Sequence, residues 1–109
     1  MDAALKAKWV EALRSGNYEQ STGALCRGEK YCCLGVLVEV GKLATKNNVH
    51  FDGVVEYLFT DGSTAAGSIP DVVGDKIRLS SGRADALINM NDYEKKSFAE
   101  IANWIEVNL

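Results

Sequence analysis

The two ends of the chain carry apolar side chains at helical spacing, and this pattern restricts the fold more than any other feature. Near the N-terminus, Leu5, Trp9 and Leu13 recur at every fourth residue. Asp2 is placed to cap the start of a helix, and Ser15-Gly16 is typical of its end. We therefore predict an N-terminal helix whose apolar stripe faces the core, with Trp9 as a packing residue.

The C-terminal helix has the clearest start signal in the chain. Ser97 and Glu100 have the spacing of a capping box, in which each side chain satisfies a backbone amide of the first turn. An apolar face at helical spacing follows, made of Phe98, Ile101, Ala102, Ile105 and Leu109. Two amphipathic helices at the ends must bury their apolar faces on the residues between them, so we predict one compact interior.

Shorter apolar runs follow the first helix. Residues 23–26 and 31–33 flank the loop 27–30, which contains a glycine and has a length typical of a β-hairpin. Residues 33–40 are nearly all apolar, and periodicity alone does not separate a buried strand from a buried helix. We favour a helix, because Gly41-Lys42 is typical of a helix end; a strand is the alternative.

The centre of the chain contains one strong strand signal. Residues 54–60 are rich in β-branched and aromatic side chains, and Asp61-Gly62 follows as a turn. Three weaker elements are expected after it: a helix over 71–75 that begins after Pro70, a short strand at 77–79, and a helix over 84–90. Together these elements predict an α+β fold, with a small antiparallel sheet and the N-terminal and C-terminal helices packed around one core.

Length and composition are those of a single folded domain over residues 1–109. The chain is 47% apolar and 25% charged, which is typical of a globular protein. It has no run of the ~20 apolar residues that would span a bilayer, and its first six residues do not form a secretory signal. We therefore expect a cytoplasmic protein without membrane association. Its modest core favours a homo-oligomer.

The three cysteines do not indicate a disulfide framework or a metal site. Cys32 and Cys33 are adjacent, and with Cys26 and His50 they lack the ligand spacing of zinc sites. At a helix N-terminus Cys33 would gain some acidity from the helix dipole, but a nucleophilic thiolate also needs a nearby base. We interpret the thiols as small buried apolar groups, and we expect no catalytic residue, metal or cofactor.

The net charge of −3 argues against nucleic-acid binding, because that binding depends on cations that neutralise phosphates. Lys6, Lys8 and Arg14 are nevertheless concentrated on the first helix, whereas the last segment carries Glu94, Glu100 and Glu106. Binding of nucleic acid through the basic first helix is therefore only the second alternative function.

Three segments of the chain resemble a known group of sequences. Residues 9–20 read Trp-Val-Glu-Ala-Leu-Arg-Ser-Gly-Asn-Tyr-Glu-Gln, residues 31–37 read Tyr-Cys-Cys-Leu-Gly-Val-Leu, and residues 97–106 read Ser-Phe-Ala-Glu-Ile-Ala-Asn-Trp-Ile-Glu. Together with Gly23-Ala24-Leu25, they resemble a group of small uncharacterised bacteriophage and prophage proteins. The resemblance covers the first and last thirds of the chain. It implies a phage origin, and hence the host cytoplasm, but it implies no activity.

Arginines in loops near aromatic rings suggest a site for a small anion, because a guanidinium group pairs with phosphate and a ring can stack on a base. Residues 80–83 precede a helix and suit either an anion nest or an ordinary helix cap. The candidate ligand-binding residues are Tyr18, Arg27, Tyr31, Arg78, Ser80, Ser81 and Arg83.

The leading hypothesis is a non-enzymatic phage accessory protein with an anti-defence role. It would bind and sequester a small anionic ligand, such as a cyclic nucleotide used in host immune signalling. The first alternative is a protein-interaction module that inhibits or redirects a host protein. Such a module would use the acidic C-terminal helix or an exposed apolar patch.

Overall fold

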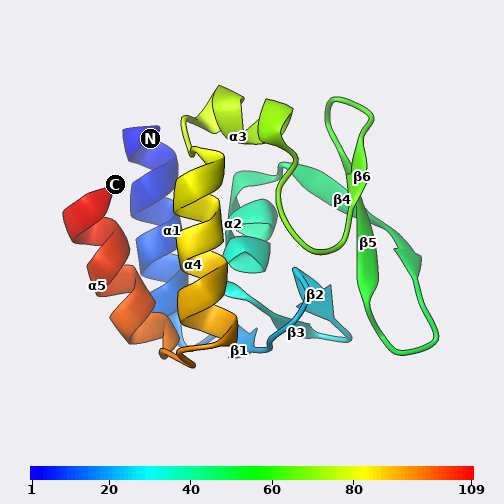
Figure 1. Ribbon diagram of the computed structural model, residues 1–109, viewed down its shortest axis with the longest axis horizontal. Coiled ribbons are helices and arrows are strands. Elements are labelled where there is room, and N and C mark those ends of the chain that lie inside the picture. The colour runs from blue at the N-terminus through cyan, green and yellow to red at the C-terminus, as the bar shows by residue number, and fades with distance from the viewer.

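The chain folds around a buried central helix, α2 (Cys33–Gly41). In the computed structural model, which describes all 109 residues, helices occupy one side and the longer strands the other (Figure 1). The remaining elements are α1 (Ala3–Ser15), β1 (Glu19–Gln20), β2 (Cys26–Arg27), β3 (Lys30–Tyr31), β4 (Ala44–Val49), β5 (Val55–Phe59), β6 (Thr64–Ala65), α3 (Asp71–Ile77), α4 (Ser81–Asp92) and α5 (Phe98–Asn108). The predicted α+β class is confirmed.

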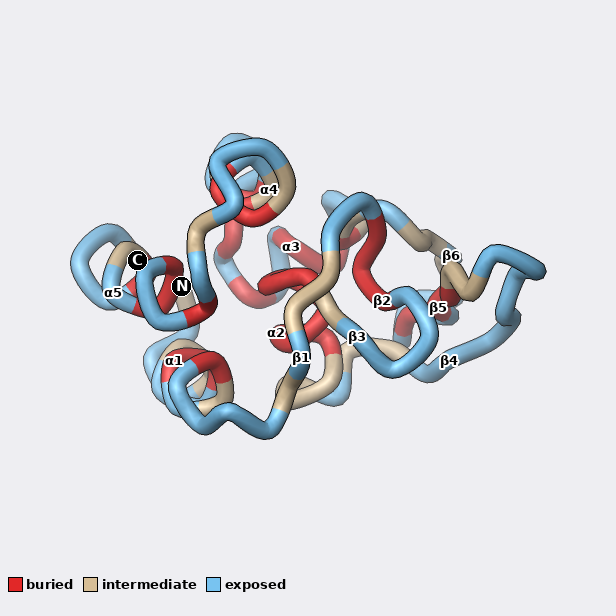
Figure 2. Tube along the Cα trace, turned by 90° about the horizontal axis from the view of Figure 1, so that it is seen from below, coloured by how far each residue is buried: buried red, intermediate tan, exposed pale blue.

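The apolar run of residues 33–40 is a helix, as favoured, and not a strand. Residues 33–38 are all buried at the centre of the molecule (Figure 2). Cys32 caps the helix, because its Sγ accepts a hydrogen bond from the Gly35 amide at 3.4 Å. A β-carbon at Gly35 would lie 1.9 Å from the Leu25 carbonyl oxygen, so only glycine permits this approach of α2 to the preceding chain.

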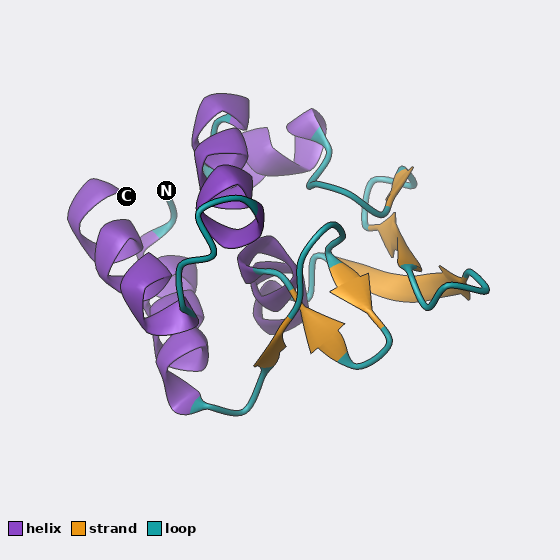
Figure 3. Ribbon diagram, turned by 60° about the horizontal axis from the view of Figure 1, so that its bottom comes forward, coloured by secondary structure: helices purple, strands orange, loops and turns teal.

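The two terminal helices form as predicted and lie side by side (Figures 1 and 3). Asp2 caps α1 by accepting from the Leu5 amide at 2.8 Å, and Gly16 ends it in the left-handed conformation. The capping box of Ser97 and Glu100 is present at the start of α5. Trp9 is fully buried, and its indole Nε1 donates to a carbonyl of α2, so its predicted packing role is confirmed.

The predicted β-hairpin around residues 27–30 is also present, with strands of only two residues. β2 pairs antiparallel with β3, and Cys26 lies opposite Tyr31. β1 adds to the other side of β3 in parallel, giving the order β1-β3-β2. We did not predict β1, because it has two polar residues and its partner lies eleven residues further along the chain.

A second sheet, with the order β4-β5-β6, projects from the helices (Figure 3). β5 is the strand predicted over residues 54–60, and the turn at Asp61-Gly62 leads into β6. We did not predict β4, because its residues are polar and almost entirely exposed, which removes the alternation that marks a half-buried strand. The single predicted sheet is therefore divided into two small sheets.

The predicted strand at 77–79 is wrong. Ile77 instead ends α3, and Arg78 adopts the left-handed conformation with φ 60°. The Leu79 amide then donates to the Gly74 carbonyl, as in a Schellman-type helix end. The alternation of apolar and polar residues arises because Ile77 and Leu79 both reach the core from either side of this cap. The helices predicted at 71–75 and 84–90 are present and longer.

One core holds the molecule together. It contains 25 buried apolar side chains from all five helices and from both sheets. Asn91 is the single buried polar residue. None of the five helices combines the length and apolar character needed to cross a bilayer.

Candidate functional site

The seven residues predicted to bind a ligand fall into two separate groups. Tyr18, Arg27 and Tyr31 lie on or beside the β1-β3-β2 sheet. The other group surrounds the turn between α3 and α4, at the opposite end of the α4 helix from that sheet (Figure 1). No cavity is lined by residues of both groups. The two groups therefore do not form one anion site.

The group at the α3–α4 turn is occupied by helix capping. Ser80 is the N-cap of α4, and its hydroxyl accepts from the Arg83 amide at 3.2 Å. The Arg83 side chain donates to the Asn108 carbonyl at 2.7 Å and lies over the Trp104 ring. Ser81 begins the helix, and Arg78 caps the previous one. These contacts correspond to the helix-cap interpretation of residues 80–83.

The second group contains an aromatic pair. The rings of Tyr18 and Tyr31 meet edge to face, with their centroids 5.4 Å apart. Lys46 Nζ donates to the Tyr31 hydroxyl at 2.9 Å and also lies over the ring. The exposed Tyr31 surface is thus already contacted by a cation of the same chain.

Arg27 lines an open polar cleft of about 550 Å³ beside this aromatic pair. The polar cleft is formed by Asn17, Glu19, Arg27, Gly28, Glu29 and Lys30. Its two cations each lie near a carboxylate, with Lys30 3.6 Å from Glu19 and Arg27 4.0 Å from Asp52. The cleft is therefore balanced in charge and not strongly cationic.

The three thiols are buried and unpaired, as predicted. Burial raises the pKa of Cys32 to about 11 and holds the pKa of Cys33 well above its ordinary value. The acidity that we expected Cys33 to gain at a helix N-terminus is outweighed by the loss of solvation of the thiolate. His50 lies in the exposed turn between β4 and β5, and no three metal-ligating side chains converge.

A chain of polar groups joins the β4-β5-β6 sheet to α2. The Tyr57 hydroxyl donates to Glu39 at 2.8 Å, and the Cys26 thiol lies beside the hydroxyls of Tyr57 and Tyr31. Burial, and secondarily the bond to Glu39, raises the pKa of Tyr57 far above its ordinary value. Burial likewise raises the pKa of Cys26. Because the Tyr57 hydroxyl and the Cys26 thiol stay protonated and line no cavity, they serve to hold the sheet against α2.

The most exposed apolar group lies where the tips of two hairpins meet. We define the hairpin-tip surface as residues 27–30, from the end of β2 to the start of β3, together with residues 49–53, at the end of β4 and in the turn that follows. Phe51 is fully exposed there, and Val49 is 61% exposed. The Gly28 amide donates to the Gly53 carbonyl at 2.8 Å, and Asp52 lies beside Arg27. Phe51 is therefore presented by a turn that is tied to the neighbouring hairpin.

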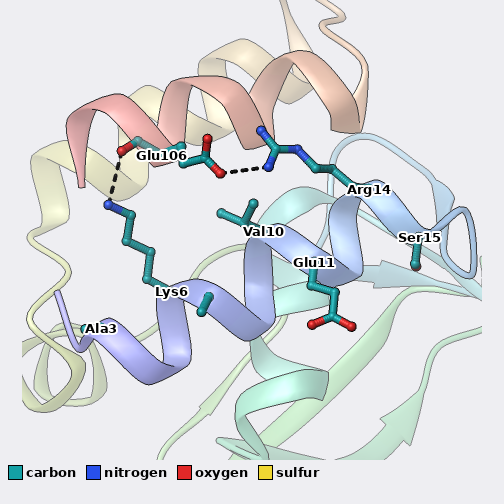
Figure 4. Close-up of a pocket in the computed structure, with 8 residues that line it drawn as sticks. Ala3, Lys6, Val10, Glu11, Arg14, Ser15 and Glu106 are labelled. Carbon is teal, nitrogen blue, oxygen red and sulfur yellow. Dashed lines mark hydrogen bonds and ion pairs between the residues drawn. The ribbon is translucent and has the colours of Figure 1, made fainter.

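Two basic residues of α1, Lys6 and Arg14, line a groove between α1 and α5 (Figure 4). Arg14 contacts the Glu106 carboxylate at 2.7 Å, and Lys6 donates to the Glu106 carbonyl at 3.2 Å. Val10 and two alanines contribute the apolar part of this groove of about 850 Å³. Two of the three cations on α1 are thus turned towards the acidic helix beside it, which weakens the nucleic-acid alternative.

A model of one protein family, the domain of unknown function DUF8296, matches residues 1–109. The chain belongs to this family. No curated protein and no solved structure matches the chain. Membership in DUF8296 thus extends over every element described above, and it assigns no activity to the hairpin-tip surface or to the polar cleft.

Sequence reasoning missed Phe51 and Asp52, although one signal was present. Phe51 is an isolated aromatic residue between His50 and Asp52-Gly53, and Asp-Gly is typical of a tight hairpin turn. An aromatic residue inside such a turn lies beyond the paired residues, so it does not belong to the alternating faces of either strand. Recognising β4 as a strand would have placed Phe51 at an exposed tip.

Proposed function

We propose that this member of DUF8296 is a non-catalytic recognition protein that binds a partner protein through the hairpin-tip surface. The observation that carries this proposal is the full exposure of Phe51 on a turn that the neighbouring hairpin holds in place. This is the first alternative considered from the sequence, with an exposed apolar patch on the β4–β5 hairpin, and not the acidic C-terminal helix, as the binding surface.

The energetics favour such a role for Phe51. Burying a phenylalanine side chain contributes about 1.5–3 kcal/mol, and aromatic anchors at the centre of an interface often dominate its affinity. A turn that is already ordered loses little further conformational entropy on binding. Arg27 and Asp52, 4.0 Å apart, place charged groups next to the anchor, and a polar rim around an apolar anchor is the usual anatomy of a protein interface.

The likeness to bacteriophage and prophage proteins at both ends of the chain supports a partner from the host cell. In that case the chain acts in the host cytoplasm and inhibits or redirects a host protein. The segment with the hairpin tip of residues 49–53 lies outside the regions of likeness. A recognition surface there could differ between related phages while the two ends keep the same fold.

This proposal is tested by capture from a bacterial host lysate on the immobilised protein. Phe51→Ser should abolish recovery of a specific partner, whereas Val107→Ser, which removes another largely exposed apolar side chain, this time from α5, should leave it unchanged. Both variants should melt within a few degrees of the wild type, because neither side chain is buried. Equal recovery by Phe51→Ser and wild type would show that the hairpin tip is not the binding surface.

Capture of a small anionic ligand, the leading hypothesis from the sequence, has one observation in its favour. The polar cleft combines Arg27 and Lys30 with the Asn17 amide and is large enough for a nucleotide. We propose this cleft as a second candidate site. Of the seven residues predicted to bind a ligand, it keeps Arg27 in its lining and Tyr18 beside it.

A melting screen with cyclic di- and trinucleotides decides this second candidate. A ligand at 100 times its dissociation constant adds about 2.7 kcal/mol to the folded state, which raises the melting temperature clearly. Arg27→Ala should remove that rise, whereas Arg83→Ala, at the other group of predicted residues, should not. If no nucleotide in the panel shifts the melting temperature, the second candidate is discarded.

A further inference from the structure

β4 is the only strand longer than two residues that has an unpaired side. It lies at one edge of the β4-β5-β6 sheet, and residues 45–49 are all exposed (Figure 2). β5 is flanked by β4 and β6, and the remaining strands have two residues each. A long exposed edge offers a row of free backbone donors and acceptors to which another extended segment can bind.

β4 and the residues just before it carry charged side chains of positive sign only. Between Lys42 and Val49 the chain has two lysines and no carboxylate, although the whole chain carries a net charge of −3. Lys42 is exposed at the end of α2. Lys46 donates to the neutral Tyr31 hydroxyl and lies over its ring. It is in none of the four ion pairs of the chain, although the Glu39 carboxylate is near enough to act on its pKa. β5 has a single carboxylate, that of Glu56, and it accepts a hydrogen bond from the Asn47 side-chain amide at 3.5 Å.

A small hollow of about 210 Å³ lies beside the start of the same strand. It is lined by Lys42, Ala44, Thr45, Leu58, Phe59 and Thr60. Leu58, on β5, is 38% exposed there. A segment that runs along β4 would place alternate side chains over this face, because successive residues of a strand point to opposite sides. The hollow can receive one apolar side chain, and Lys42 is placed to pair with a carboxylate next to it.

From this combination we infer that the edge of β4 takes up an extended, acidic segment of a partner protein as a fourth strand of the sheet. The inference deepens the proposed function and rests on it, since the same partner would contact Phe51. Backbone hydrogen bonds supply affinity, the hollow selects an apolar side chain, and the two lysines select carboxylates.

A second copy of this chain is a poorer occupant than a flexible segment. The register between β4 and β5 shifts between Lys46 and Asn48, which marks a bulge at Asn47. A bulge increases the local twist and hinders pairing of two rigid sheet edges. Pairing of two β4 strands would also bring lysines of the same sign together. A flexible segment can follow the twisted edge and carry the opposite charge.

The probe for this inference is a displayed library of random dodecapeptides selected on the folded, full-length protein. Enriched peptides should combine acidic residues with β-branched or aromatic residues. Synthetic copies, titrated into ¹⁵N-labelled protein, should shift the amide signals of residues 44–49 and slow their hydrogen exchange. Selection that yields no binder, or binders without acidic residues, overturns the inference.

Lys42→Glu provides the decisive variant, because it reverses one charge at this edge. It should weaken peptide binding about tenfold, as expected for an exposed charge in contact with its partner. Lys95→Glu is the matched control, since Lys95 has the same left-handed backbone conformation and lies outside the sheet. Equal loss of affinity in the two variants, or amide shifts confined to α1 and α5, would overturn the β4 assignment.

The outcomes for Phe51 and for β4 can be separated. Phe51→Ser should still bind the selected peptides, because the edge of β4 is intact, even though capture of the whole partner is lost. Retained peptide binding without any Phe51-dependent capture would reject the proposed function and leave the edge site. Capture of a partner that depends on Phe51, without any peptide binding at β4, would reject the edge site and leave the hairpin tip.

Discussion

At the scale of single residues, Asn91 has the most consequential side chain in the core. Its Oδ1 accepts from the Cys33 amide at 3.2 Å and from Gln20 Nε2 at 2.9 Å, and its Nδ2 donates to the Ser21 carbonyl at 2.8 Å. These bonds join the segment around β1, the start of α2 and the end of α4. A single buried amide thus connects three parts of the chain that are distant in sequence.

Asn91→Ala should therefore lower the free energy of unfolding by about 2–4 kcal/mol, because buried partners lose their hydrogen bonds. Urea denaturation measures this loss. Asn89→Ala is the control, because Asn89 lies two residues earlier on the exposed side of α4. It should lower the free energy of unfolding by less than about 1 kcal/mol. A loss of the same size in both variants would show that the network of Asn91 contributes little.

At the scale of elements, the approach of α2 to the chain before β2 depends on a glycine. Gly35→Ala must displace either α2 or the Leu25 carbonyl, because 1.9 Å is far below contact distance. We expect a loss of more than about 3 kcal/mol, comparable to severe overpacking. Gly82→Ala, in the first turn of α4, has open space around its β-carbon and should be neutral or stabilise by up to about 1 kcal/mol.

Thermal melting of the two glycine variants checks this prediction. A Gly35→Ala protein as stable as the wild type would mean that α2 can move away from Leu25 at no cost. The same comparison reports on the Tyr-Cys-Cys-Leu-Gly run of residues 31–35, since it asks whether the glycine of this run is required for packing.

At the scale of the whole molecule, the buried thiols and Tyr57 make stability depend on alkaline pH. Burial raises the pKa values of Cys26, Cys32, Cys33 and Tyr57 in the folded state. Above about pH 9 the unfolded chain releases thiol protons that the folded chain retains. The stabilisation is therefore complete below that pH and is lost as the pH rises towards the folded values.

Urea denaturation at pH 8 and pH 10 should reveal this loss. The free energy of unfolding should fall by up to about 1.4 kcal/mol per pH unit for each group that titrates only in the unfolded chain. Cys32→Ala should reduce the slope of the free energy of unfolding against pH by the contribution of one such group. A stability that is constant between these pH values would contradict the burial of the thiols.

The sequence by itself determined the elements whose signals are local. The caps at Asp2, Gly16 and Ser97, the apolar stripes of α1 and α5, and the turn at Asp61-Gly62 depend on neighbours within a few residues. Such features form in the same way wherever the element is placed, and they sufficed to predict the α+β class and the helices. The burial of the thiols followed from their apolar surroundings in the chain.

Only the tertiary structure decided which residues meet. β1 is a strand because β3, eleven residues further along the chain, satisfies its backbone groups, and β4 is a strand because it pairs with β5 across the following turn. The polar residues of both strands carry no periodic signal. The predicted ligand residues were grouped by chemistry, yet the fold places Arg83 against the end of α5 and Arg27 against the β4–β5 turn. The exposure of Phe51 is also a tertiary effect. The β4–β5 turn is held against the β2–β3 hairpin, and in this position the Phe51 side chain lies outside the core.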